Sequence, residues 1–263
     1  MGSPIRIGAV VYLNARPLTW ALDWSPARWL VRYDVPSVCA ELLHRGDVDL
    51  GLIPSIDYLQ RPDYRLVPGI GVCSRGDIAT VALYTRKDVR DVRSVALDTS
   101  SRTSVALTRV LCAKRYGIDP AFVAHAPDLA AMVEQCDAAL LIGDPAFDAD
   151  HPSLGLRKID LGAEWTIMTG LPFVYAAWTG RTGALQPGDV EALQRAQREG
   201  LAAIDAIAAE YGGGNDGVTR RAARYLRDNV KYSLGPDEAA GLQLFLDYAA
   251  ELGLGQRRKV EFY

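Results

Sequence analysis

The sequence contains few of the residues that mark metal-binding, disulfide-rich or redox proteins. Of its 263 residues, four are cysteines and three are histidines. The histidines are scattered and no carboxylate cluster joins them, so we expect no metal site. The cysteines form no C-x-x-C pair, and buried reduced thiols fit their wide spacing better than two disulfides do. They are Cys39, Cys73, Cys112 and Cys136.

Charge and hydropathy exclude further classes of protein. The formal net charge is −3 and no basic run occurs, so no basic face is expected for nucleic acid. No apolar run approaches the length that spans a bilayer, and residues 1–10 do not resemble a signal peptide. If the chain starts at its native end, which residues 1–3 leave open, we expect a cytoplasmic protein that contacts no membrane. No motif for a nucleotide, flavin or other cofactor is present.

One stretch is rich in hydroxyl groups. Residues 99–104 read Thr-Ser-Ser-Arg-Thr-Ser, with five hydroxyls in six residues. A short β-prone segment precedes them, and apolar residues at helical spacing follow. The first N–H groups of such a helix lack backbone partners and attract anions. A cap by Ser101 or Thr103 accounts for one hydroxyl only. We therefore predict that Ser101, Thr103 and Ser104 bind a carboxylate, because no phosphate loop occurs.

Other polar residues follow predicted strands. Asn14 ends the strand at residues 5–11 and is either an N-cap or an amide aimed into a cleft. Ser55 occupies a similar corner after the strand at residues 48–53. Gly143 and Asp144 follow the apolar strand at residues 138–142, at the edge where open α/β sheets bind ligands. Thr80, inside a strand predicted for residues 78–85, by itself reflects only β-propensity.

The order of predicted elements favours an α/β fold with two lobes. Strands and helices alternate up to residue 178, and three helices follow at residues 189–211, 216–232 and 236–252, then a short strand at residues 259–262. We predict one lobe from residues 1–83 plus 174–263 and a second inserted as residues 84–173. The cleft between them would hold Asn14, Ser55 and Thr80 on one wall and Ser101, Thr103, Ser104, Gly143 and Asp144 on the other.

With these residues in place, the chain resembles the chorismate dehydratase family of the futalosine route to menaquinone. The resemblance runs through residues 5–178 in one order, and the C-terminal helices match only in character. Ala15 replaces the cysteine or other small residue expected there, and Thr80 stands where family members have serine. The matching segments are Tyr12-Leu13-Asn14-Ala15-Arg16-Pro17-Leu18, Leu52-Ile53-Pro54-Ser55, Ser100-Ser101-Arg102-Thr103-Ser104, Leu140-Leu141-Ile142-Gly143-Asp144, and Trp165-Thr166 through Thr169-Gly170-Leu171-Pro172-Phe173-Val174.

The resemblance implies a periplasmic-binding-protein-like type II fold used as an enzyme. It implies that chorismate, a small-molecule substrate, loses water to give 3-[(1-carboxyvinyl)oxy]benzoate without a cofactor. Asn14 and Thr80 become the expected catalytic groups, with Ser55, Ser101, Thr103, Ser104, Gly143 and Asp144 binding substrate. The base stays open between His125, Asp144 and a carboxylate of the substrate, and the role of Arg16 and the oligomeric state also stay open.

Two other functions fit parts of this pattern. A solute-binding protein could recognise a small carboxylate without chemistry, although the absence of a signal peptide argues against it. The sister enzyme 1,4-dihydroxy-6-naphthoate synthase shares the fold. The Ser-Ser-Arg-Thr-Ser turn and the segment at residues 165–174 favour the dehydratase.

Overall fold

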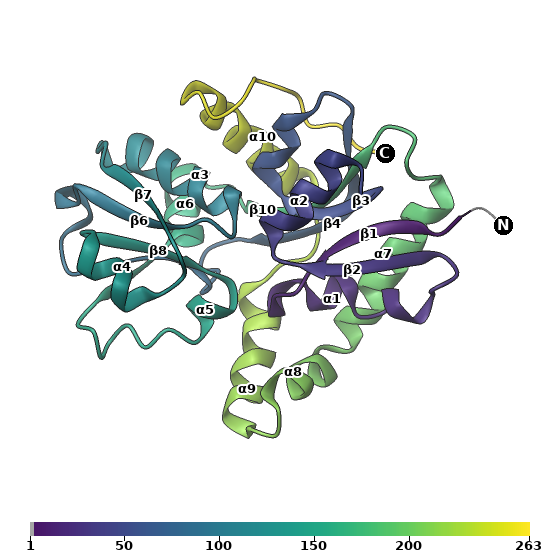
Figure 1. Cartoon of the computed structure of the whole chain (residues 1–263), viewed down its shortest axis with the longest axis horizontal. Helices are drawn as coiled ribbons and strands as arrows, with labels where there is room; N and C mark the ends of the chain where they lie inside the picture. Colours follow the sequence, from purple (N-terminus) through teal and green to yellow (C-terminus); the bar gives the residue numbers. More distant parts are fainter. Residues whose placement is uncertain (1–2) are drawn as a thin grey trace.

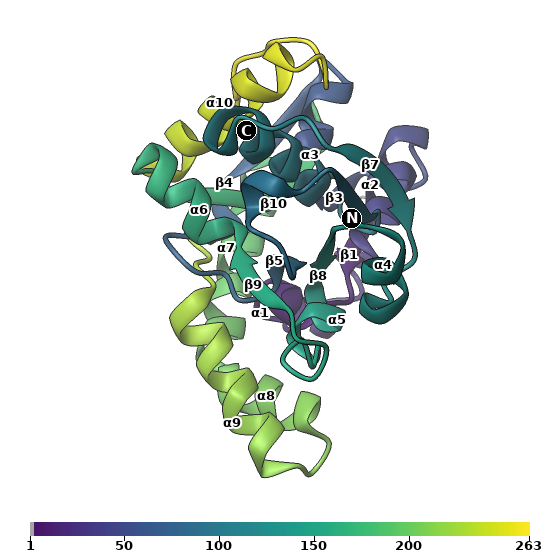
Figure 2. The ribbon, with the colours of Figure 1, turned by 90° about the vertical axis from the view of Figure 1, so that its left-hand side faces the viewer.

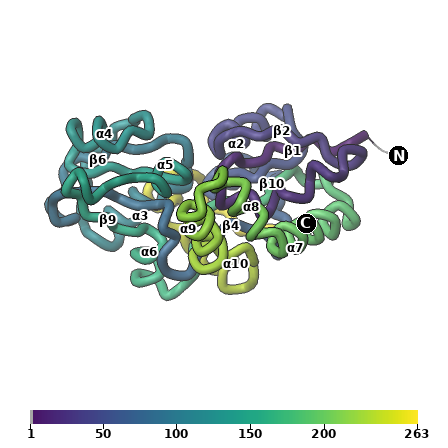
Figure 3. The backbone as a smooth tube through the Cα atoms, turned by 90° about the horizontal axis from the view of Figure 1, so that it is seen from below, coloured from purple at the N-terminus to yellow at the C-terminus, as the bar shows by residue number. Residues whose placement is uncertain are grey.

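The computed structural model describes residues 3–263, which form two five-stranded sheets. The first sheet has the order β2-β1-β3-β10-β4 and the second β7-β6-β8-β5-β9. Figures 1 and 3 show them side by side, each covered by helices. We call the first sheet with its helices lobe 1 and the second sheet with its helices lobe 2. These two units confirm the predicted two-lobed α/β fold. The strand bounds are β1 Ile5–Val10, β2 Trp29–Asp34, β3 Leu50–Pro54, β4 Tyr64–Ser74, β5 Val81–Thr85, β6 Ser94–Asp98, β7 Ala121–His125, β8 Ala138–Ile142, β9 Arg157–Asp160 and β10 Phe173–Arg181.

Both sheets mix parallel and antiparallel strands. In lobe 1, β1 pairs in parallel with β2 and β3, and β10 runs antiparallel between β3 and β4. In lobe 2, β6 pairs in parallel with β7 and β8, and β5 runs antiparallel between β8 and β9. The strand β8 is buried along its whole length, as its apolar sequence predicts for a central strand.

The chain crosses between the lobes twice, after β4 and before β10. The strand β5 lies wholly in the second sheet, so Thr80 precedes the strand in which we placed it. A boundary between residues 83 and 84 would cut through β5. We therefore propose the first crossing at residues 75–80 and keep the second near residue 173.

The helices on the sheets follow the predicted pattern in lobe 2 and in the first half of lobe 1. Gly46 and Gly117, which have positive φ, end the helical segments Pro36–Arg45 and Cys112–Tyr116. The four cysteines are buried and free, as expected. Within residues 3–263 no helix is long and apolar enough to cross a bilayer. The helices and single turns are η1 Leu13–Ala15, α1 Arg16–Thr19, η2 Leu22–Trp24, α2 Pro36–Arg45, η3 Ser55–Gln60, η4 Val89–Asp91, α3 Arg102–Leu111, the π-helical η5 Cys112–Tyr116, α4 Leu129–Gln135, α5 Gly143–Phe147 and α6 Leu161–Thr169.

The C-terminal region contains four α-helices where the sequence predicted three. They are α7 Pro187–Ala202, α8 Ile204–Gly212, α9 Asp216–Arg224, which continues as the π-helical η6 Tyr225–Asn229, and α10 Pro236–Glu251. The predicted helix at residues 189–211 is interrupted at Ala203. Just before the break, Gly200 lies so close to the carbonyl of Pro17 that a Cβ atom would overlap it. Packing of α7 on α1 thus fixes its course, and α8 and α9 project as a hairpin (Figures 1 and 2).

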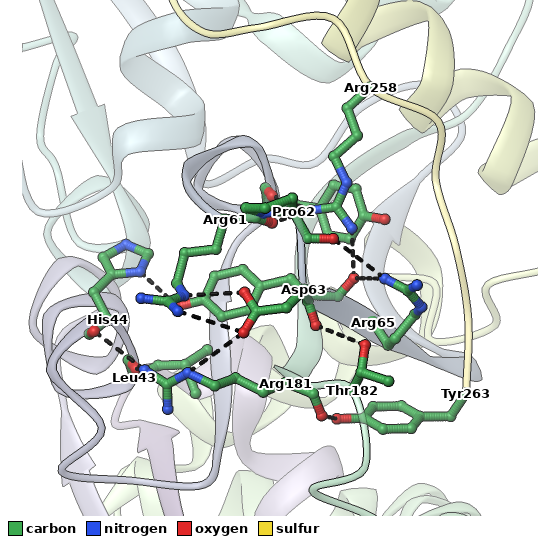
Figure 4. A network of polar contacts seen from close by, with 12 residues as sticks. Leu43, His44, Arg61, Pro62, Asp63, Arg65, Arg181, Thr182, Arg258 and Tyr263 are labelled. Carbon is green, nitrogen blue, oxygen red and sulfur yellow. Dashed lines mark hydrogen bonds and ion pairs between the residues drawn. The ribbon is translucent and has the colours of Figure 1, made fainter.

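Arginines attach the C-terminal tail to lobe 1 (Figure 4). Arg258 donates to the carbonyl oxygens of Tyr58 at 3.1 Å and Tyr64 at 2.6 Å. The Tyr263 hydroxyl donates to the carbonyl of Arg181 at 2.6 Å. The final strand predicted at residues 259–262 is reduced to a single bridge between Leu66 and Phe262, where Leu66 exchanges backbone hydrogen bonds of 3.0 Å with Glu261 and Tyr263.

Candidate functional site

A cavity lies between the two sheets. The space inside it, counted together with the open solvent at its mouth, is about 460 Å³. Lobe 1 contributes the ends of β1 and β3, the η1 turn and β10, whereas lobe 2 contributes the start of β5, the end of β8 and the first turn of α3. The lining residues are Val10, Tyr12, Asn14, Ala15, Pro36, Leu52, Pro54, Val72, Val81, Ser101, Ser104, Ile142, Gly143, Tyr175 and Ala176.

The predicted site residues divide into two groups around this cavity. Asn14, Ser101, Ser104 and Gly143 line it. The other predicted residues lie behind the lining, where they bind other parts of the protein; these are Ser55, Thr80, Thr103 and Asp144.

The hydroxyl-rich turn contributes fewer groups to the cavity than its sequence suggests. Ser100 donates from both its backbone and its hydroxyl to Asp98, at 3.0 and 2.6 Å. Thr99 is exposed. The Ser104 hydroxyl donates to Ser101 Oγ at 3.2 Å, and Ser101 makes no side-chain cap on α3. Two hydroxyls therefore lie beside an α-helix N-terminus that the Ser101 side chain does not cap, which suits an anion.

Thr103 and Ser55 join the lobes instead of lining the cavity. Thr103 Oγ1 accepts a hydrogen bond from the backbone N–H of Ile56 at 3.2 Å and lies 3.4 Å from Ser55 Oγ. Ser55 itself donates to the carbonyl of Val174 at 2.7 Å. Next to them, Arg102 reaches out of lobe 2 to Asp57 of lobe 1, at 3.0 Å. These contacts hold the first turn of α3 against lobe 1.

Asn14 lies in the η1 turn and caps no helix. Neither η1 nor α1 has a side-chain cap, so the N-cap interpretation of Asn14 is wrong. A 3₁₀ turn begins at Leu13, one residue before Asn14, and this places the amide on the cavity wall. The interpretation of Asn14 as an amide aimed into the cleft fits this position.

Thr80 lies directly behind the lining in a strained turn. The preceding Ala79 has a φ of +68°, and no other non-glycine residue among those described has a positive φ. Such a conformation is unfavourable for a residue with a Cβ. Asp160 holds the turn by accepting hydrogen bonds from the N–H groups of Ile78 at 3.1 Å and Ala79 at 2.6 Å. The crossing between the lobes thus presents Thr80 in a fixed orientation.

Gly143 provides room for an aromatic ring that the sequence did not single out. It has a φ of +62°, and an added Cβ would lie 2.8 Å from Cδ2 of Tyr12. Only glycine fits both the backbone conformation and this close approach. Tyr12 and Tyr175 both line the cavity. Both belong to or border segments of the family resemblance, which was the available signal for them.

The lining carries no group that ionises near neutral pH. Its polar side chains, Tyr12, Asn14, Ser101, Ser104 and Tyr175, are neutral there. Burial raises the pKa of the Tyr12 phenol and, more strongly, that of Tyr175. Both phenols therefore keep their protons and can donate hydrogen bonds.

Two candidates left open by the sequence lie away from the cavity. His125 ends β7 at the edge of the second sheet, and its Nδ1 lies 2.6 Å from the carbonyl of Ala126. Arg16 lines a different hollow and pairs with Glu210 at 3.0 Å. Among residues 3–263, no three His, Cys, Asp or Glu side chains group so as to hold a metal ion.

Asp144 connects the lobes. Its carboxylate accepts a hydrogen bond from the backbone N–H of Leu13 at 3.1 Å. Burial raises its pKa to about 6, against the opposing effect of that hydrogen bond. The folded protein therefore takes up this proton at a higher pH than the unfolded chain does.

Changing Asp144 to asparagine is expected to alter the pH dependence of stability. A raised carboxyl pKa lowers stability as pH rises from about 4 to 6, because the folded state must then lose its proton. The amide of the variant would stay neutral and still accept the Leu13 N–H. The gain in stability from Asp144→Asn, followed as the rise in Tm over wild type, should thus be absent near pH 4 and reach its maximum by pH 7. That maximum corresponds to a free energy of unfolding larger by up to about 3 kcal/mol. The exposed Glu134→Gln variant is the control. Parallel wild-type and Asp144→Asn curves would contradict the assignment.

Three comparisons place this geometry among known proteins. A family model described as menaquinone biosynthesis matches residues 5–251. The chorismate dehydratase of Thermus thermophilus is 32% identical over 268 residues, covering 95% of this chain and 96% of its own. That of Campylobacter jejuni is 28% identical over 180 residues, covering 65% of this chain and 66% of its own.

Solved structures show the same fold at low identity. A protein from Archaeoglobus fulgidus superposes with a TM-score of 0.76 at 20% identity, covering 96% of this chain and 99% of its own. The periplasmic aliphatic sulphonate binding protein of Escherichia coli superposes with a TM-score of 0.69 at 20% identity, covering 99% and 96%. The periplasmic-binding-protein-like fold predicted from the sequence is thereby confirmed.

Proposed function

This chain belongs to the menaquinone biosynthesis family, and we propose that it is a chorismate dehydratase, a carbon–oxygen lyase that forms 3-[(1-carboxyvinyl)oxy]benzoate. The observation that carries the proposal is the first turn of α3, which brings Ser101 and Ser104 to the same cavity as Asn14. The two relatives named chorismate dehydratase support it.

The anion site fits the charge that this reaction develops. Chorismate loses the C3 proton and the C4 hydroxyl, and the ring carboxylate, conjugated through C1=C2, gains negative charge as the proton leaves. The N-terminus of α3 with the hydroxyls of Ser101 and Ser104 would bind that carboxylate. Fixed dipoles of this kind stabilise developing charge without reorganising. Aromatisation supplies much of the driving force.

We assign the reacting carbons to the side of the cavity that holds Asn14 and Thr80. Asn14 lines the cavity. Thr80 lies next to the lining, since its neighbour Val81 lines the cavity and the lining residue Gly143 donates its N–H to the Thr80 carbonyl at 2.9 Å. Their amide and hydroxyl would bind the departing C4 hydroxyl and orient the ring. Ser55, Thr103 and Asp144 would support the site by holding the lobes together.

The neutral lining favours a carboxylate of the substrate as the base. No Asp, Glu, His or Lys is among the lining residues in the described part of the chain. A proton leaving C3 would pass to a chorismate carboxylate, and the C4 hydroxyl would leave as water after taking up a proton. The protein's part is then to bind, orient and exclude water.

Turnover of chorismate tests the proposal. EDTA-treated protein without added metal, nucleotide or flavin is expected to convert chorismate into 3-[(1-carboxyvinyl)oxy]benzoate. Chromatography and mass spectrometry would detect the product. Chorismate incubated without protein is the control. Tight binding with no conversion would instead favour a solute-binding protein. Activity that returns only when metal is added would contradict the site as described.

A further inference from the structure

The phenol of Tyr225 lies behind the cavity, in contact with both proposed catalytic residues. Its side chain is buried at 3% exposure, and Tyr225 begins the π-helical segment η6. Its hydroxyl oxygen lies 2.6 Å from Thr80 Oγ1, and the Asn14 side chain is close enough to lower the pKa of the phenol. Short π-helical segments are rare and often occur at functional sites.

Aromatic packing fixes the ring of Tyr225. Its centroid lies 5.4 Å from that of Phe147, on α5 of lobe 2. Phe147 packs edge-on against Tyr211 at 5.8 Å, and the guanidinium of Arg221 lies 4.2 Å from the Phe147 ring. The ring of Tyr225 therefore packs against lobe 2 through Phe147. Its hydroxyl lies beside Asn14 of lobe 1 and Thr80 at the crossing between the lobes.

The chemistry of the phenol suits alignment of neighbours rather than proton abstraction. Burial raises its pKa far above neutral pH, although hydrogen bonds from Thr80 and Asn14 partly counter that rise. The phenol thus keeps its proton, and either hydroxyl can be the donor in its 2.6 Å contact with Thr80 Oγ1. When the phenol donates, Thr80 can direct its own proton toward the cavity, and the phenol oxygen can accept from the Asn14 amide.

We propose that Tyr225 is a positioning residue that aligns Asn14 and Thr80 for the dehydration of chorismate. This inference rests on the proposed function. Tyr225 is not among the residues that line the cavity, so it would act through the side chains of Thr80 and Asn14.

The test is the variant Tyr225→Phe, which removes one oxygen and keeps the ring. We expect kcat for chorismate to fall about 10- to 100-fold, as for a misplaced catalytic group. KM should change by less than about twofold, since Ser101 and Ser104 of the anion site are untouched. A purely structural role would lower stability without this separation of kcat from KM.

Tyr232→Phe is a matched control. Tyr232 is also buried and lies seven positions further on, but its hydroxyl has no hydrogen-bond partner among the described residues. Removal of that hydroxyl should leave kcat and KM unchanged. A second comparison uses Thr80→Val alone and combined with Tyr225→Phe. Because Tyr225 acts in part through Thr80, the loss of kcat in the double variant should be smaller than the product of the two single losses.

The outcomes separate this inference from the proposed function. Wild-type protein that does not convert chorismate refutes the proposed function. If wild type is active and Tyr225→Phe is equally active, only the role of Tyr225 is refuted. The same holds if the losses of kcat in Tyr225→Phe and Thr80→Val multiply independently in the double variant. If Tyr225→Phe does not fold, Phe147→Leu keeps the phenol but loosens its ring and should lower kcat in the same direction; an unchanged kcat there would also refute the role.

Discussion

Replacing Asn14 by aspartate is expected to lower kcat/KM for chorismate by roughly 30- to 4,000-fold while the protein stays folded. The change removes the NH₂ donor of the amide and places a negative charge beside a dianionic substrate. The lost hydrogen bond and the repulsion together correspond to about 2–5 kcal/mol in a desolvated cleft. No basic side chain on the lining would offset the new charge, since the polar groups there are neutral.

The structure offers a matched control for that substitution. Asn215 is a true N-cap, whose side chain accepts hydrogen bonds from the N–H groups of Gly217 at 2.9 Å and Val218 at 3.2 Å. Aspartate caps a helix as well as asparagine does, so Asn215→Asp should leave both activity and Tm nearly unchanged. An Asn14→Asp enzyme as active as Asn215→Asp would remove Asn14 from the proposed catalytic site.

Replacing Asp160 by alanine is expected to cause the largest loss of stability, about 3–5 kcal/mol. Its carboxylate accepts hydrogen bonds from Ile78 and Ala79 at the lobe crossing, and from Gly162 at 2.9 Å and Ala163 at 3.1 Å in the first turn of α6. Without it the strained turn at Ala79 loses its support, and four N–H groups lose their acceptor. The expected fall in Tm is roughly 5–10 °C for a chain of this length.

Asp128→Ala is the control for this experiment. Asp128 caps α4 through a single bond to the N–H of Ala131 at 3.2 Å, so its loss should cost about 1 kcal/mol. Thermal and urea unfolding of both variants would compare the two sites. Equal losses would contradict the proposed support of the crossing. Because Thr80 follows the strained turn, Asp160→Ala should also reduce turnover at temperatures where it stays folded.

Local patterns in the sequence identified the hydroxyl-rich turn and the strand ends around the cavity. Hydroxyl-rich residues between a β-prone segment and helical spacing predict a helix N-terminus, because that pattern depends on neighbours in the chain alone. The same holds for Gly143 after the apolar β8. Which of the hydroxyls face the cavity was not readable, because Thr103 binds the backbone N–H of Ile56, 47 positions away, and this contact exists only after folding.

The sequence by itself determined the alternation of strands and helices, the family resemblance and the helix N-terminus that follows the hydroxyl-rich turn. These depend on periodicity, on short motifs and on the unpaired N–H groups of a helix end. Only the tertiary structure decided that Tyr225 meets Asn14 and Thr80, that Asp160 supports the turn at Ala79, and that Ser55 and Thr103 join the lobes. In each case the partners are separated by long stretches of chain, and the contact arises from how the two sheets and the C-terminal helices pack, which no local pattern encodes.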